Sequence, residues 1–117
     1  MKNLLISTLE TLGYPVHLQG TMNPDEAYPP SFITVFTQFS EDAANFDNET
    51  FAVSWQHQVI FYSSDPVLVE SVPTTIRNTL KKAGFIPQGR GHDIPSDEPS
   101  HTGWVQEYLF LETRKER

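Results

Sequence analysis

The segment from Ser63 to Gly84 constrains the fold of this chain more than any other part of the sequence. It opens with Ser-Ser-Asp-Pro, in which a polar residue caps a helix and proline suits the first helical position. It ends at Gly84, a residue that suits the left-handed conformation closing many helices. Between these signals the apolar residues fall on one helical face: Leu68, Val69, Val72, Ile76 and Leu80. We therefore predict one central helix, which Pro73 either kinks or restarts.

Two β-rich segments precede this helix and two follow it. Residues 31–39 are rich in β-branched and aromatic side chains, which suit a largely buried strand. Residues 51–61 alternate, and one face carries Phe51, Val53, Trp55, Val59 and Phe61, interrupted by His57, while the other carries Ser54, Gln56 and Gln58. After the helix, residues 85–93 predict a glycine-punctuated strand whose Pro87 indicates a sheet edge. Residues 104–112 predict the last strand.

The remaining segments complete an α+β pattern. Apolar residues at helical spacing from Leu4 to Leu12 predict a short first helix, and residues 15–20 suit a short strand. The acidic segment 41–49 is expected to be an exposed connection. This order predicts a single domain over residues 1–117: a two-layer α+β fold with a mainly antiparallel sheet and two helices packed on one face.

The composition excludes several classes of function. The 117 residues include no cysteine, which rules out thiolate zinc sites, disulfide bonds and thiol catalysis, and fits a reducing compartment. We expect neither a signal peptide nor a membrane span, because no apolar run is long enough. The net charge of −7 opposes binding to a phosphate backbone, which depends on lysine and arginine.

One polar cluster is a candidate for chemistry. Imidazole and carboxylate groups are the ligand types of zinc and manganese, so His92, Asp93 and His101 are metal-ligand candidates, with Asp97 beside them. Their spacing matches no known metal signature, and carboxylates at 93 and 97 also suit a turn-rich loop. We therefore predict a structured loop, with no metal, no cofactor and no catalytic residue.

Other candidate sites have plainer structural explanations. Gly89-x-Gly91 lacks the third glycine and the following helix of a phosphate cradle, and a β-bulge or hairpin explains it better. No G-x-S-x-G elbow accompanies the serines, and Ser63 and Ser64 suit helix capping. His57 is expected to be a buried or interface histidine with a satisfied hydrogen bond. The aromatic residues alternate as core residues do, rather than forming a platform for bases.

Five short stretches together resemble a known protein family. They are Tyr28-Pro29-Pro30-Ser31-Phe32-Ile33-Thr34, Asp47-Asn48-Glu49, Phe61-Tyr62-Ser63-Ser64-Asp65-Pro66, Lys81-Lys82-Ala83-Gly84-Phe85, and the run from Gly89 through Ser96-Asp97-Glu98-Pro99 to His101-Thr102-Gly103. The chain is similar over these stretches to tail-terminator or head-to-tail joining (tail completion) proteins from prophages and long-tailed phages of Gram-positive bacteria. Trp104 and Pro73 depart from the family pattern.

The resemblance implies a structural virion protein, not an enzyme. Such a subunit closes the tail tube or joins it to the head as a ring, commonly a hexamer, through head-to-tail contacts. The implied partners are further copies of the chain, the major tail protein and head-completion proteins, with DNA passing through the lumen and no membrane. The implied location is the virion, and the host cytoplasm during assembly. The residues expected at contacts are Asp47, Asn48, Trp55, Asp93, Asp97, His101 and Trp104.

Two alternatives come from other classes of protein. The first is a small metal-dependent hydrolase that uses His92, Asp93, Asp97 and His101. The second is an acidic adaptor, or an inhibitor that mimics DNA, for which the negative charges would have to align along one face. The sequence disperses those charges among predicted loops.

Overall fold

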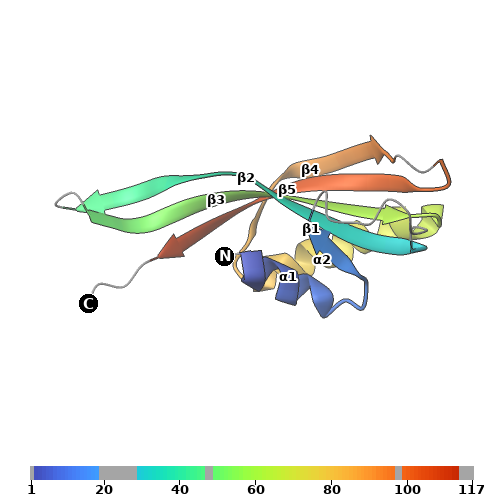
Figure 1. The fold of residues 1–117 in the computed structure, drawn as a ribbon, viewed down its shortest axis with the longest axis horizontal. Helices are drawn as coiled ribbons and strands as arrows, with labels where there is room; N and C mark the ends of the chain where they lie inside the picture. Colours follow the sequence, from blue (N-terminus) through green and yellow to red (C-terminus); the bar gives the residue numbers. More distant parts are fainter. Residues whose placement is uncertain (1, 19–28, 47–48, 97–98, 114–117) are drawn as a thin grey trace.

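The fold is a five-stranded sheet with two helices on one face (Figure 1). The computed structural model describes residues 2–18, 29–46, 49–96 and 99–113. Its elements are α1 (Lys2–Glu10), β1 (Val16–Leu18), β2 (Ser31–Phe46), β3 (Glu49–Ser63), α2 (Pro66–Lys82), β4 (Ile86–Pro95) and β5 (Thr102–Thr113). The strand order is β1-β2-β3-β5-β4, in which β1 runs parallel to β2 and every other neighbouring pair is antiparallel. The predicted two-layer α+β fold is confirmed.

The central helix α2 begins and ends at the signals in its sequence. Asp65 is the N-cap, and its carboxylate accepts a hydrogen bond of 3.0 Å from the Val67 amide. Gly84 adopts φ +101°, and the amide of Phe85 donates to the Leu80 carbonyl, as in a Schellman closure. The helix is continuous through Pro73, so it does not restart there.

The core lies between the two helices and the inner face of the sheet. Its strand residues include Ile33, Val35, Val59 and Phe61, and its helix residues include Leu5, Leu9, Val72, Ile76 and Leu80. His57 shares this inner face and is fully buried, with Nδ1 at 3.0 Å from Thr37 Oγ1. The expectation of a buried histidine is confirmed, and Thr37 supplies the hydrogen-bond partner of one of its two ring nitrogens.

The acidic segment 41–49 differs from the prediction. Instead of an exposed connection, β2 continues to Phe46 and β3 begins at Glu49. The antiparallel ladder pairs Glu41 with Ser54 and Asp42 with Val53, and register shifts at two positions let it continue. Cross-strand hydrogen bonding therefore overrides the weak β-propensity of Asp and Asn.

Candidate functional site

The three central strands of the sheet, β2, β3 and β5, extend beyond the two outer strands, β1 and β4. β1 pairs only with residues 33–35 of β2, and β4 reaches β5 only as far as Leu109. Past these points β2, β3 and β5 continue alone, as a three-stranded ribbon that leaves the helix layer behind (Figure 1). We call this ribbon, residues 36–46, 49–57 and 110–113, the arm. It makes the molecule elongated, with extents of 53 × 28 × 22 Å.

The face of the sheet opposite the helices carries exposed apolar side chains on the arm. Phe36 is 46% exposed, Phe39 54% and Leu111 51%. Phe36 pairs with Gln58 and Phe39 with Gln56, so a bulge between the two phenylalanines places both on this outer face. We treat this outer face of the arm as a candidate interaction surface, because exposed apolar side chains gathered together are a feature of such surfaces.

Trp55 lies on the inner face of the arm. Its indole Nε1 donates a 2.9 Å hydrogen bond to Glu112 Oε1, and its ring stacks on His57 at 6.2 Å with an interplanar angle of 6°. It is half-buried, so part of the ring stays accessible to a partner. The structure thus gives this predicted contact residue a role within the arm itself, since its hydrogen bond ties β3 to the end of β5.

The arm edge of β2 and the β4 edge both carry features that disfavour the addition of a further strand. The arm edge of β2 carries the exposed carboxylates Glu41 and Asp42 and two irregularities in register. The opposite edge, β4, carries Pro87 and Pro95, and the expectation that Pro87 lies on a sheet edge is confirmed. Charges, bulges and prolines are the features that protect edge strands from aggregation. A partner would therefore meet side chains here rather than an open backbone ladder.

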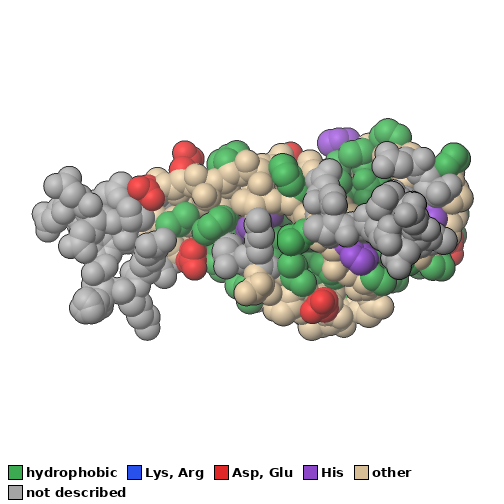
Figure 2. All heavy atoms as spheres, in the orientation of Figure 1, with side chains coloured by type: hydrophobic (Ala, Val, Ile, Leu, Met, Phe, Trp, Pro, Cys, Tyr) green, Lys and Arg blue, Asp and Glu red, His purple; other side chains and the backbone are tan. Residues whose placement is uncertain are grey.

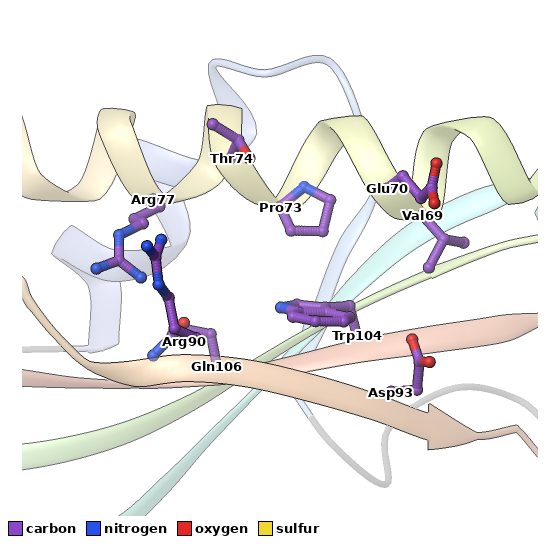
Figure 3. Close-up of a pocket in the computed structure, with 9 residues that line it drawn as sticks. All are labelled: Val69, Glu70, Pro73, Thr74, Arg77, Arg90, Asp93, Trp104 and Gln106. Atoms are coloured by element: carbon purple, nitrogen blue, oxygen red, sulfur yellow. The ribbon is translucent and has the colours of Figure 1, made fainter.

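A cleft of about 550 Å³ separates α2 from β4 and β5 (Figure 3). The residues that line it are Val69, Glu70, Pro73, Thr74, Arg77, Arg90, Asp93, Trp104 and Gln106. The indole of Trp104 lies between the helix and β4, at the centre of the view in Figure 3. Two predicted contact residues, Asp93 and Trp104, therefore line one cavity, although they come from different strands.

A glycine bulge in β4 shapes this cleft. The register shifts between Gln88 and His92, so three residues of β4 stand opposite Gln106 alone, and the predicted bulge is confirmed. Gly89 and Gly91 adopt φ of +74° and +85°, which other residues rarely take. A Cβ on Gly91 would lie 2.5 Å from Trp104 Nε1, so only glycine leaves room for the indole.

The carbonyls freed by the bulge are held by side chains. Gln106 Nε2 donates to the carbonyls of Gln88 and Gly89, at 2.7 and 3.2 Å. Arg77 Nη1 donates to the Gly89 carbonyl from the helix side, at 3.1 Å. These bonds fix the wall of the cleft, because they supply donors to two carbonyls at the bulge, where the register of the β4–β5 ladder is interrupted.

The charged groups in the cleft are segregated. Arg77 and Arg90 lie together at one end, and Glu70 and Asp93 lie toward the other, with Trp104 between them (Figure 3). Within the described part of the chain, neither arginine forms a salt bridge with a carboxylate. This arginine pair was not predicted from the sequence. Its members are 13 positions apart, and the bulge that contains Arg90 places it in the same cleft as Arg77.

Tyr108 lies in the core on the inner face of the sheet. Burial raises the pKa of its hydroxyl well above the ordinary value, and the positive charge of Arg77 acts weakly in the opposite direction. The phenol therefore stays neutral. It contributes packing volume rather than a charge.

The candidate metal ligands do not converge. His92 and Asp93 are exposed neighbours on β4, so their side chains point to opposite faces, and Asp93 is the one that lines the cleft. His101 is buried, and its Nε2 donates to the Pro29 carbonyl at 2.8 Å while Nδ1 accepts from Ser100 Oγ at 2.9 Å. No group of three His, Asp or Glu residues in the described ranges is placed to hold a metal ion.

Three predicted contact residues, Asp47, Asn48 and Asp97, lie outside the described residues. A scan against protein-family models found no match for this chain, and a search of curated proteins found none either. Neither of the two helices in the described ranges has the length and apolar character that crossing a bilayer requires. A functional proposal therefore rests on the geometry of the arm and the cleft, together with the resemblance of short motifs.

Proposed function

We propose that this chain is a structural virion protein that terminates the tail tube or joins tail to head as one subunit of a ring. The observation that carries the proposal is the arm, a three-stranded ribbon that extends past its own helix layer and exposes Phe36, Phe39 and Leu111. Such a ribbon buries little surface by itself, so packing against another molecule stabilises it.

A ring is the assembly that suits this subunit. The arm and the cleft are different surfaces on one chain, and contacts between unlike surfaces are heterologous and close into a ring when the rotation permits. The proposed partners are further copies of the chain, with the major tail protein and head-completion proteins above and below. The net charge of −7 suits a lumen through which DNA passes without adhering.

The two alternatives receive less support from the geometry. A metal-dependent hydrolase needs convergent ligands, whereas His92 and Asp93 point to opposite faces of β4 and both ring nitrogens of His101 have hydrogen-bond partners within the protein. A DNA mimic needs carboxylates along one face, whereas the neighbours Glu41 and Asp42 point to opposite faces of β2. We therefore retain assembly as the proposed function.

The test is a deletion of the gene in the phage or prophage that encodes the chain. We expect negative-stain images to show heads and tails that have not joined, or tails of uncontrolled length. Supplying the wild-type chain in trans should restore joined particles. Supplying a Phe36→Ser/Phe39→Ser variant should restore fewer, because it removes apolar contact surface. Normal joined particles in the complete absence of the chain would overturn the proposal.

A further inference from the structure

The arginine end of the cleft is built to receive an anion. Arg77 is held in place by its bond to the Gly89 carbonyl, and Arg90 projects from the bulge beside it (Figure 3). Two like charges this close repel each other, and a carboxylate between them removes the repulsion. Guanidinium groups also bind carboxylates in paired, directional hydrogen bonds. The ligand expected at this end is therefore a carboxylate-bearing one.

The chain itself carries a concentrated source of carboxylates. Residues 41–49 contain four acidic residues and no basic one. Glu41 and Asp42, the two whose side chains the structure describes, are exposed on the edge strand of the arm. Figure 1 shows that the arm projects away from β4 and the start of α2, and these elements carry residues that line the cleft. A chain therefore cannot place its own arm in its own cleft, whereas a second copy can.

We propose that the arginine cleft binds the acidic arm of a second copy of this chain, with Arg77 and Arg90 together holding one carboxylate of its edge strand, Glu41 or Asp42, whose side chains point to opposite faces of that strand. The inference rests on the proposed function in one respect, since it names the contact through which the ring subunits would join. Pro73 and Trp104 supply an apolar wall for the incoming strand. Glu70 and Asp93 repel acidic groups at the far end, so the arm enters with its carboxylates toward the arginines.

Charge reversal on each surface tests the contact. Sedimentation velocity of the purified full chain should show self-association that weakens as salt is raised, because screening acts on exposed charge pairs. Arg90→Glu should weaken self-association by about tenfold or more, since it places like charges opposite each other. Lys82→Glu is the matched control, because it makes the same charge change at an exposed site on α2 outside the cleft, and it should change the affinity by less than about twofold. Arg90 is exposed, and substituting it leaves the Arg77 bond to the Gly89 carbonyl in place.

Complementation makes the test specific. An arm variant, Glu41→Lys/Asp42→Lys, and a cleft variant, Arg77→Glu/Arg90→Glu, should each remain monomeric. Mixed together they should associate in alternation, because the intact arm of one variant meets the intact cleft of the other, and the lysine arm meets the glutamate cleft. The chain carrying all four substitutions should associate again, since both charges are exchanged. Thermal melts confirm that each variant is folded.

Three outcomes would overturn the inference: a wild-type chain that is monomeric at low salt up to about 1 mM, an Arg90→Glu variant that associates as the Lys82→Glu control does, or a mixture of the arm and cleft variants that forms no mixed complex. Each of these outcomes would leave the proposed function intact, provided that particles still fail to join when the gene is deleted. Conversely, complementation as expected, together with normal particles in the deletion strain, would uphold the contact and end the virion proposal.

Discussion

Replacing Gly91 with alanine tests the construction of the cleft. The residue adopts φ +85°, and a Cβ there would lie 2.5 Å from both Trp104 Nε1 and the Val105 carbonyl oxygen. The left-handed backbone costs a side chain about 1–2 kcal/mol. Displacing a packed indole and a strand carbonyl adds about 1–3 kcal/mol. We therefore expect Gly91→Ala to lower the free energy of unfolding by about 2–5 kcal/mol, out of a total of about 5–15 kcal/mol.

Gly89→Ala is the matched control. Gly89 also has a positive φ, of +74°, but a Cβ there would meet no heavy atom within 4 Å. It shares the backbone cost of about 1–2 kcal/mol and the small gain from a stiffer unfolded chain. Urea unfolding followed by far-UV circular dichroism measures both variants against wild type. Equal losses of stability for the two variants would show that Trp104 does not pack over the bulge, and the geometry of the cleft would then be wrong.

Three further substitutions probe the elements around this site. Asp65→Ala removes the N-cap of α2 and should cost about 1 kcal/mol in chemical denaturation, whereas Ser64→Ala, one residue earlier, should cost less than about 0.5 kcal/mol. Gln106→Leu removes the donor to the Gln88 and Gly89 carbonyls and should cost about 1–3 kcal/mol, and an unchanged denaturation midpoint would contradict that role. Burial raises the pKa of Tyr108 above the unfolded value of 10.0, so stability should be constant below about pH 10 and fall as the pH rises beyond it, because only the unfolded phenol ionises. Tyr108→Phe should flatten that decline in melts recorded from pH 8 to 11, and an equally steep decline in the variant would assign the effect to other groups.

The sequence predicts the elements whose signals are local. The helix α2 follows from the capping Asp65, the closing Gly84 and the apolar stripe between them, because each acts within one or two turns. Likewise, the edge position of β4 follows from Pro87, which cannot donate to a sheet ladder, and the bulge follows from two nearby glycines. Periodicity and caps therefore suffice to predict the two layers and the succession of helices and strands along the chain.

The arm and the cleft depend on pairing between distant segments. Glu41 and Asp42 occur in a stretch with poor β-propensity, and only the ladder to residues 53 and 54 makes it strand. Similarly, Arg90 lies within the bulge and lines the same cleft as Arg77, and no spacing in the sequence encodes that arrangement. A bulge can be anticipated from glycine, but the direction in which it turns a side chain depends on the partner strand.

Residues of the run from Gly89 to Gly103 pack on both faces of the sheet. Gly91 leaves room for Trp104 on the inner face, and a Cβ on Gly103 would lie 2.7 Å from the ring of Tyr62. At the end of the run, His101 hydrogen-bonds to the Pro29 carbonyl and its ring lies 6.0 Å from that of Phe32, a buried outer-face residue. Gly91, Gly103 and His101 thus serve packing, so substituting them should reduce stability before it affects any partner. Arg90 and Asp93, on the same run, are exposed and line the cleft, and so we expect substitutions at these positions to alter assembly while the fold is kept.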